Sequence, residues 1–353
     1  MKKIRVFLGG YINSINAQNL NCLALAKHLD RSKFEIGTMT IYSGTLDVSE
    51  LKDVKIFNAF YPHKISKYIA YALGILWADV VYLPKGEICN WNKFLIKFLR
   101  KKSFRTIEGI YSDEILDQFL NKGISKKEFE NFFVGYNKIY SITNFIKEFN
   151  YKICGITTDT KVLYLGIDTK TFNYNRKRTS LENIIMIGNA LKEKGVMEYL
   201  KLAELFPGIN FHIVGSGHDL TTDEKRYFTK YNNIIYHGIL SHKKLFELIK
   251  LMDLHILFSK TEGFPKVVIE TAAASVPSII YSDYGASEWI DNGQNGFIID
   301  SFDESVEIIN KLINNPKYLT QISKNAFLMA QKFSWENQIK NWENIIISIY
   351  KGE

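Results

Sequence analysis

Residues 260–277 read KTEGFPKVVIETAAASVP, and they indicate a loop followed by a short helix. Pro265 suits the first turn of that helix, because the N–H that proline lacks is one that a helix start leaves unpaired anyway. Free backbone N–H groups at a helix start favour anions, and Gly263 lets a ligand approach the backbone. The stretch therefore predicts a cradle for phosphate groups at the start of a helix over 267–274.

Two glutamates, Glu262 and Glu270, flank the predicted cradle. A carboxylate only accepts hydrogen bonds, so it suits the vicinal hydroxyls of a sugar or a ribose. An eight-residue step along an ideal helix rises roughly 12 Å, a length over which a sugar, a diphosphate and a ribose can be placed in order. The alternative is that both glutamates only interact with the dipole of the helix start, and for two isolated glutamates this alternative is the simpler one.

Outward from this stretch, short apolar runs rich in β-branched residues alternate with helical periodicity and predict an α/β fold. The predicted strands are 4–8, 80–83, 184–187, 211–214, 254–258 and 278–281, and predicted helices include 19–29, 197–205, 243–252 and 267–274. Two segments, 4–10 and 184–195, each show a strand, a glycine-containing turn and a helix start. This repetition predicts two doubly wound parallel sheets, each binding ligands at the carboxyl ends of its strands. We place the link between them within 142–179.

The composition is that of a folded protein and not of a disordered chain. A length of 353 residues suggests two domains, and 46% of the residues are hydrophobic while 23% are charged. Cys22, Cys89 and Cys154 are widely spaced and match no metal-ligand pattern, which favours reduced thiols in a cytoplasmic protein, without a disulfide or zinc. The longest uncharged apolar stretch, 68–78, is well short of the roughly 20 residues that cross a bilayer.

Several short motifs follow one another along the chain. They are Gly9-Gly10, the LGID of 165–168, Gly188 through Gly195, Gly215-Ser-Gly217, Gly238-Ile-Leu240, and Glu262-Gly-Phe with Glu270. In this order they resemble the retaining glycosyltransferase family 4, which has the GT-B fold, and the match is tight from about 184 to 297. The resemblance implies two Rossmann-like domains facing a cleft: an acceptor domain over 1–165 and a donor domain over 168–332. A helix over 333–353 would cross back to the first domain.

The resemblance also implies roles for single residues. Glu262 would contact the donor sugar, with Gly263 and Phe264 offering backbone contacts beside it. Lys194 would hold the diphosphate and Glu270 the ribose, and Glu262 and Lys194 are the residues implied in catalysis. The other implied donor contacts are Gly10, which lets the amino-terminal loop approach the diphosphate, Asn189, Gly215, and Ile239 and Leu240 near the base.

Two positions depart from the family pattern. Asn189 stands five residues before Lys194, where the family usually has Arg, so one fixed cation is missing, and Lys192 or another basic residue is a candidate to replace it. After residues 105–107 the family often shows a His near the acceptor, whereas this chain has Glu108. Glu108 is then a candidate for acceptor contact or for a base, and a plain surface glutamate is the reading that we favour.

The implied reaction moves a hexose or N-acetylhexosamine from a nucleotide sugar, such as a UDP-sugar, to a hydroxyl of a glycan or lipid-linked acceptor. It belongs to surface polysaccharide or glycolipid assembly. Lys194 and helix-start N–H groups would stabilise the charge on the leaving phosphate, with no metal and no other cofactor. Two alternatives stay open: a nucleotide-sugar epimerase of the same architecture, and a non-catalytic partner of an active transferase, which Asn189 and the absent His suggest.

Residues 90–105, NWNKFLIKFLRKKSFR, interleave apolar residues with cations. Two interpretations stay open: a helix lying on an anionic membrane, with access to a lipid-linked acceptor, or a core-facing helix with a solvated basic face. We expect a cytoplasmic protein, peripheral on the inner face of the membrane under the first interpretation. The net charge of +8 comes with no recognisable nucleic-acid-binding module, so we expect no nucleic-acid partner.

Overall fold

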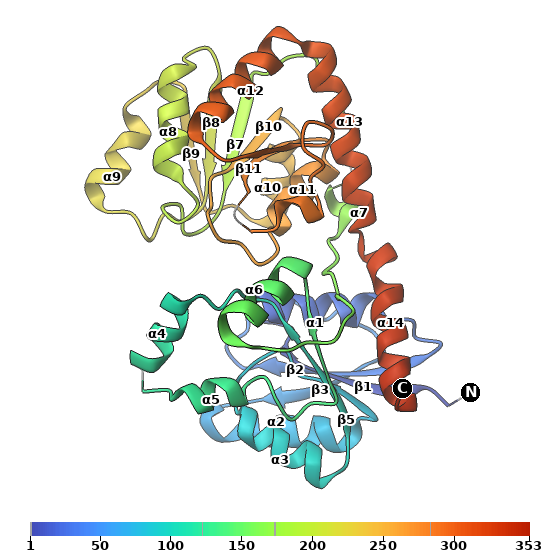
Figure 1. Cartoon of the computed structure of the whole chain (residues 1–353). Coiled ribbons are helices and arrows are strands. Elements are labelled where there is room, and N and C mark those ends of the chain that lie inside the picture. The colour runs from blue at the N-terminus through green and yellow to red at the C-terminus, as the bar shows by residue number, and fades with distance from the viewer. Residues whose placement is uncertain (1, 122, 173, 283) are drawn as a thin grey trace. The chain divides into compact units, whose positions relative to one another are not determined.

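The computed structural model divides the chain into two compact units. Unit 1 comprises 1–166 together with 335–353, and unit 2 comprises 167–334. The structure describes residues 2–121, 123–172, 174–282 and 284–353. Each unit holds a six-stranded parallel sheet with helices packed on it (Figure 1). The structure therefore confirms the predicted α/β class and the two doubly wound sheets.

Unit 1 has the strand order β3-β2-β1-β4-β5-β6. Its strands are β1 (Ile4–Tyr11), β2 (Phe34–Ile41), β3 (Val54–Ala59), β4 (Val80–Tyr82), β5 (Lys102–Ile107) and β6 (Lys138–Ser141). Its helices are α1 (Ala17–His28), α2 (His63–Trp77), α3 (Cys89–Phe98), α4 (Asp113–Asn121), α5 (Lys126–Asn131), α6 (Asn144–Cys154) and α14 (Trp335–Lys351). Helix α1 packs against α14, while α2 packs against α3 on the opposite face of the sheet (Figure 1).

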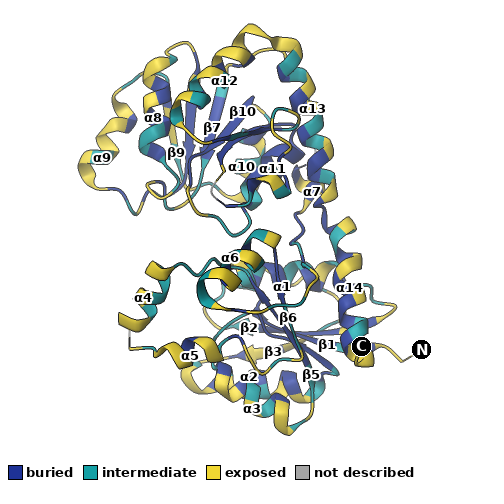
Figure 2. Ribbon diagram, in the orientation of Figure 1, coloured by how far each residue is buried: buried dark blue, intermediate teal, exposed yellow. Residues whose placement is uncertain are grey.

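Unit 2 has the strand order β12-β11-β10-β7-β8-β9. Its strands are β7 (Asn183–Ile187), β8 (Asn210–Val214), β9 (Ile234–Gly238), β10 (Leu254–Leu257), β11 (Ser278–Tyr281) and β12 (Phe297–Ile299). Its helices are α7 (Thr169–Phe172), α8 (Val196–Leu205), α9 (Thr222–Arg226), α10 (His242–Ile249), α11 (Lys266–Ala273), α12 (Phe302–Asn314) and α13 (Pro316–Lys332), with 3-10 turns at Tyr227–Thr229 and Ala286–Glu288. The central strands are buried, and the outer helix faces are exposed (Figure 2).

The last helix, α14, belongs to unit 1 and follows directly on Ser334. Trp342 is fully buried there, and its indole N–H donates to the carbonyl of Tyr164 at 3.0 Å. The Glu343 carboxylate pairs with the Lys33 ammonium at 2.8 Å. An apolar anchor and an ion pair therefore hold the end of the chain on a unit that begins more than 300 residues earlier.

Strand β5 corrects the prediction of one helix over 90–105. Helix α3 ends at Phe98, and residues from Lys102 onward form a buried strand between β4 and β6. Arg105 is 5% exposed, and its guanidinium donates to the carbonyl of Phe132 at 2.5 Å. Arg105 is therefore a buried residue of β5, although its sequence context resembles the basic face of a helix.

We predict that unit 2 loses stability when the pH falls below about 6.5. Burial, and secondly the stacked ring of His237, lower the pKa of His212 to about 4, while burial lowers the pKa of His255 to about 3. Both values lie below the pKa of about 6.5 of an unfolded histidine, so the unfolded chain binds these protons more tightly. The free energy of unfolding is therefore highest above about pH 6.5 and decreases as the pH falls. At about pH 5 the decrease is about 2 kcal/mol for each of the two histidines.

Urea denaturation at neutral pH and at about pH 5 measures this loss. His255→Gln keeps a side chain that can bond to the Ser278 hydroxyl, which lies 2.9 Å from His255 Nδ1, but this side chain does not titrate. The loss between the two pH values should shrink by about 2 kcal/mol in that variant. An unchanged pH dependence would contradict the assignment to His255.

Candidate active site

The carboxyl ends of four neighbouring strands of unit 2 carry residues that the sequence singled out. In the order β10-β7-β8-β9, Glu262 follows the first strand, Lys194 the second, Gly215 the third and Ile239 the fourth. Neighbouring parallel strands lie about 4.8 Å apart, so these four strand ends extend over roughly 14 Å. The edge of the sheet therefore offers a row of loops at least as long as the roughly 12 Å over which a sugar, a diphosphate and a ribose were expected.

This row replaces the predicted placement along one helix. Helix α11 begins at Lys266 with Pro265 as its N-cap, so Glu262 lies in a loop and not within a helix. Only the step from Lys266 to Glu270 is helical, and it rises roughly 6 Å. Because the loop that carries Glu262 is not helical, the expected contacts to sugar, diphosphate and ribose do not follow one helix. They extend across the strand ends, and only Glu270 lies on α11.

The loop between β10 and α11 is held by its aromatic residue. Phe264 packs edge-on against Trp289, with ring centroids 5.7 Å apart, and lies 5.9 Å from the ring of Phe333. The carbonyl of Phe264 accepts from the N–H of Lys266 at 2.9 Å. Gly263 occupies the bend just before this anchor. The side chain of Phe264 therefore fixes the loop, and its backbone turns toward the helix start.

Lys194 and Glu262, which are 68 residues apart in sequence, meet in the fold. The Lys194 ammonium lies 2.5 Å from Glu262 Oε1, and the two side chains are only 24% and 14% exposed. Gly188 lies under the lysine stem, since a Cβ there would be 2.8 Å from Lys194 Cγ. Charge-assisted bonds of this kind are short and strong. The structure thus brings together the two residues to which the resemblance assigns catalysis.

Gly215 allows the loops after β7 and β8 to touch. Its φ of +148° is in the range that favours glycine, and a Cβ there would lie 1.7 Å from the carbonyl oxygen of Gly188. Its N–H donates to the carbonyl of Gly238 at 2.9 Å. Any side chain at this position would push the loop that carries Lys194 away from its neighbour.

Asn189 and Lys192 contribute differently from what the sequence suggested. The Asn189 carbonyl accepts from the N–H of Gly217 at 3.1 Å, while the residue itself is exposed. The Lys192 ammonium lies 2.7 Å from Glu224 on α9, and this pairing, followed by a backbone N–H bond from Thr221, holds the pKa of that carboxyl near 2. In this structure Lys192 is therefore engaged at α9 and does not take the place of the missing arginine.

Glu270 lies half-buried on α11, near the start of α10. Burial raises the pKa of its carboxyl, while His242 at the start of α10 and Lys266 oppose the rise. Ile239 and Leu240 lead directly into α10, and Ile239 is 74% exposed. The exposed side chain of Ile239 offers an apolar surface on which a flat nucleotide base could pack. Glu270 lies near the start of α10, which follows Ile239 and Leu240 in the chain.

Gly10 has a packing role that corrects its expected place in a loop. Strand β1 continues to Tyr11, so Gly9 and Gly10 lie within the strand and are buried. A Cβ on Gly10 would lie 2.7 Å from the sulfur of Cys22 on α1. The missing side chain therefore lets α1 approach β1.

The structure corrects the interpretation of Glu108 as a plain surface glutamate. Glu108 is half-buried after β5, and its Oε1 accepts from the Thr106 hydroxyl at 3.2 Å. The amide nitrogen of Asn21 lies 3.5 Å from the same oxygen. A carboxylate set among polar groups at a strand end is a better candidate for acceptor contact than its sequence context indicates.

Sequence reasoning missed a polar cluster at the carboxyl ends of β1 and β4. Glu87 accepts from the Tyr11 hydroxyl at 3.0 Å, and the His63, Lys67 and Lys85 side chains lie 3.4, 3.4 and 3.7 Å from its carboxylate. Burial lowers the pKa of Lys85, although Glu87 counters this. These residues have no common spacing: Tyr11 ends β1, His63 and Lys67 lie on α2, and Lys85 and Glu87 follow β4, so no local motif marked them. Among the described residues, no three His, Cys, Asp or Glu side chains form a group suited to a metal.

A family model described as "Glycosyl transferases group 1" matches residues 168–329. An uncharacterised glycosyltransferase of Haemophilus influenzae is 28% identical over 190 residues, which are 48% of this chain and 51% of that protein. The N,N'-diacetylbacillosaminyl-diphospho-undecaprenol alpha-1,3-N-acetylgalactosaminyltransferase of Campylobacter jejuni is 27% identical over 276 residues, which are 76% of this chain and 66% of that protein. The crystal structure of Anabaena HepE in complex with UDP and glucose matches with a TM-score of 0.76 and 16% identity, over 98% of this chain and 100% of that one.

The matched segment spans about half the length of the Haemophilus protein. The likeness to HepE, at its low sequence identity, concerns the fold alone, and that fold is the expected GT-B fold. The family match covers the part of unit 2 that contains Lys194, Glu262 and Glu270. Residues 168–329 of this chain are therefore similar to the group 1 glycosyl transferases.

Proposed function

We propose that the chain is a retaining glycosyltransferase of family 4. It moves a hexose or N-acetylhexosamine from a nucleotide sugar to a hydroxyl of a glycan or lipid-linked acceptor. The observation that carries this proposal is the contact between Lys194 and Glu262 at the carboxyl edge of the unit 2 sheet. The names of two similar proteins support it: HepE was crystallised with UDP and glucose, and the Campylobacter enzyme is named for a diphospho-undecaprenol compound.

The ion pair suits a site that exchanges partners when the donor binds. In the free protein the Lys194 ammonium and the Glu262 carboxylate neutralise each other. A diphosphate offers the ammonium a second anionic partner, and the carboxylate then accepts hydrogen bonds from sugar hydroxyls. When the bond from the anomeric carbon to the phosphate oxygen breaks, negative charge grows on that oxygen, and the ammonium is in place to stabilise it. We propose that this charge stabilisation serves the reaction without a metal ion.

The nucleoside lies at the other end of the row. Ile239 and Leu240 face the base, and Glu270 accepts hydrogen bonds from the ribose hydroxyls. The backbone of Asn189 and the close contact at Gly215 shape the loops in between. In unit 1, Glu108 contacts the acceptor. The reaction takes place in the cytoplasm, a reducing compartment to which the free Cys22, Cys89 and Cys154 are suited.

Glu270→Ala tests the placement of the ribose. A hydrogen bond between a charged group and a hydroxyl is worth about 1.5–3 kcal/mol, so the wild type should bind UDP at least about tenfold more tightly than 2',3'-dideoxy-UDP. In the variant, we expect the two dissociation constants to agree within about twofold. Isothermal titration calorimetry measures both. If Glu270→Ala still bound UDP about tenfold more tightly than 2',3'-dideoxy-UDP, another residue would be the one that bonds to the ribose hydroxyls.

The function itself is tested in two steps. Thermal-shift measurements with UDP-, GDP- and ADP-sugars identify the donor, because a ligand at about 100 times its dissociation constant adds about 2.7 kcal/mol to stability. Incubation with that donor and candidate acceptors, followed by NMR of the anomeric proton, should show a new bond with the donor's configuration, at a rate that EDTA does not change. An altered sugar formed without acceptor would establish an epimerase instead. Donor binding without turnover on any acceptor would establish a non-catalytic partner.

A further inference from the structure

Helix α2 is apolar on two opposite faces. One face packs on the sheet with Ser66, Ala70, Tyr71, Gly74 and Ile75. The other face consists of large apolar side chains that are 40–64% exposed, namely Ile65, Tyr68, Ile69, Leu73 and Leu76. A helix that is apolar all round is normally covered on all sides. The outer face of α2 therefore lacks a cover in this structure, as its exposed stretch shows in Figure 2.

Helix α3 extends this exposed face. Trp91, Phe94 and Phe98 are 40%, 58% and 72% exposed, and their rings stack in sequence with centroids 6.0 and 5.9 Å apart. The ring of Tyr68 on α2 lies edge-on to Trp91 at 5.9 Å, so the two helices form one surface. We refer to these eight side chains of α2 and α3 as the α2–α3 face.

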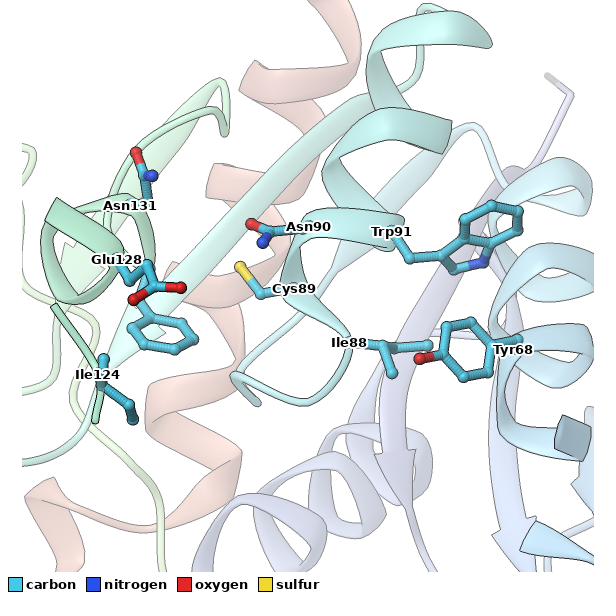
Figure 3. A pocket seen from close by; sticks show the side chains of 9 residues that line it. Tyr68, Ile88, Cys89, Asn90, Trp91, Ile124, Glu128 and Asn131 are labelled. Atoms are coloured by element: carbon cyan, nitrogen blue, oxygen red, sulfur yellow. The ribbon is translucent and has the colours of Figure 1, made fainter. Parts of the chain in front are cut away.

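A pocket of about 300 Å³ opens beside this face. Figure 3 shows Tyr68 and Trp91 at one end of the pocket, with Ile124 and Glu128 at the other. The face thus borders a hollow whose lining combines the apolar Ile124 and Phe132 with the polar Glu128 and Asn131. Exposed aromatic rings beside a partly polar hollow are suited to the boundary between lipid chains and head groups, where amphipathic rings gather.

The two helices of the face carry charges of one sign, while Glu128 lines the far end of the pocket and Glu87 pairs with Lys67 on the buried side of α2. Neither α2 nor α3 contains Asp or Glu, while Lys64, Lys97 and Arg100 are exposed on or just after these helices. Between Glu87 and Glu108 the sequence has six cationic residues and no acidic one, of which Arg105 is buried in β5 and is not part of this surface. Such a combination of apolar and cationic side chains is typical of segments that bind anionic membrane surfaces.

We propose that the α2–α3 face docks on the surface of an anionic lipid bilayer. A second copy of the chain is the other possible cover, but pairing two such faces would bring their cations together, and like charges repel. An anionic bilayer instead attracts each Lys or Arg by about 1 kcal/mol and accepts the aromatic rings at its interface. Among the described helices, none is long and apolar enough to span a membrane.

The inference deepens the proposed function by favouring a lipid-linked acceptor, and for that step alone it rests on the proposed function. An enzyme docked through unit 1 meets acceptors whose lipid part stays in the bilayer. Binding to vesicles can be measured without donor or acceptor. A failure to bind vesicles is therefore distinguishable from a failure to transfer sugar.

Co-sedimentation of the full chain with phosphatidylglycerol or phosphatidylcholine vesicles tests the proposal. The wild type should bind phosphatidylglycerol vesicles, bind phosphatidylcholine more weakly, and lose affinity at high salt. The triple variant Trp91→Ser, Phe94→Ser and Phe98→Ser should lose at least about tenfold in affinity for phosphatidylglycerol. Its thermal stability and UDP binding should stay near wild type, because these side chains are exposed and lie in unit 1.

The matched control replaces three exposed leucines of unit 2, Leu205, Leu251 and Leu328, by serine. These residues are 53–60% exposed and lie at three separate places, at the end of α8, just after α10 and on α13, so the control should bind vesicles like the wild type. Equal binding by the wild type and the aromatic variant would overturn the proposal. A wild type that ignores vesicles but dimerises in ultracentrifugation, and becomes monomeric in the aromatic variant, would overturn it in favour of a second copy.

Discussion

Lys194→Ala is expected to lower kcat/KM by about 10²- to 10³-fold. The ammonium contacts Glu262 at the strand ends, and in the proposed function it stabilises the charge that develops on the leaving diphosphate. Its loss also leaves the Glu262 carboxylate, which is only 14% exposed, without this partner, so the site repels the diphosphate in the ground state as well. We therefore expect both weaker donor binding and slower transfer. Initial rates of nucleotide release and calorimetric titration with UDP measure the two effects separately.

A matched control lies two residues away. Lys192→Ala removes an equal charge whose ammonium pairs with Glu224 on α9, and it should change the rate by no more than about twofold. The double variant Lys194→Ala with Glu262→Gln should regain UDP affinity relative to Lys194→Ala, because the repelling carboxylate is neutral, while kcat stays low. A rate for Lys194→Ala within about threefold of wild type would remove the lysine from the mechanism.

The sequence predicted the buried strands of the fold better than the edge strands. The central strands β1, β4, β7, β8, β10 and β11 are apolar runs, and each was predicted to within a few residues. Strands β3 and β9 lie at sheet edges, where about half of their residues face solvent, so neither forms such a run. Strand β5 is buried but polar, because Ser103 and Thr106 find hydrogen-bond partners inside the unit. A pattern of apolar residues does not reveal a buried strand whose polar side chains form hydrogen bonds with residues distant in sequence.

The candidate site shows the same limit. Glu262 and Lys194 were singled out through motifs, but no spacing along the chain shows that residues 68 positions apart meet at 2.5 Å. Their meeting depends on strand order, which places β7 next to β10. The same holds for Glu87, which follows β4 but meets Tyr11 at the end of the adjacent strand β1 and Lys67 on α2. Local sequence carries the chemistry of a residue, whereas the topology decides what lies beside it.

Arg178 is a further residue whose role only the fold reveals. In sequence it ends the basic segment 173–178, of which Asn173 lies outside the described residues. In the fold its guanidinium is fully buried, donates from Nε to the carbonyl of Met252 at 2.7 Å and lies 3.9 Å from Asp253 Oδ1. The other oxygen of Asp253 accepts from the N–H groups of Glu182 and Asn183, both at 3.0 Å.

These bonds connect the amino ends of β7 and β10, the two strands whose opposite ends carry Lys194 and Glu262. Burial raises the pKa of Asp253, while the backbone bonds and the nearby arginine lower it. Burial likewise lowers the pKa of Arg178 to about 10, with Asp253 opposing the shift. Each charge is thus tolerable inside the unit because the other is present. The pair therefore supports the strand alignment on which the candidate site depends.

Arg178→Met is accordingly expected to cost about 3–5 kcal/mol of unfolding free energy, because it leaves Asp253 as an unpaired buried carboxylate. For a unit of this size the melting temperature should fall by roughly 10 °C. Lys177→Ala, which removes the adjacent but exposed cation, should stay within about 0.5 kcal/mol of wild type. Adding Asp253→Asn to Arg178→Met removes the stranded charge and keeps an acceptor for the two backbone N–H groups, so it should restore at least about 1 kcal/mol. Urea denaturation of the four proteins decides the matter: a double variant no more stable than Arg178→Met would show that lost packing, and not the unpaired carboxylate, accounts for the destabilisation.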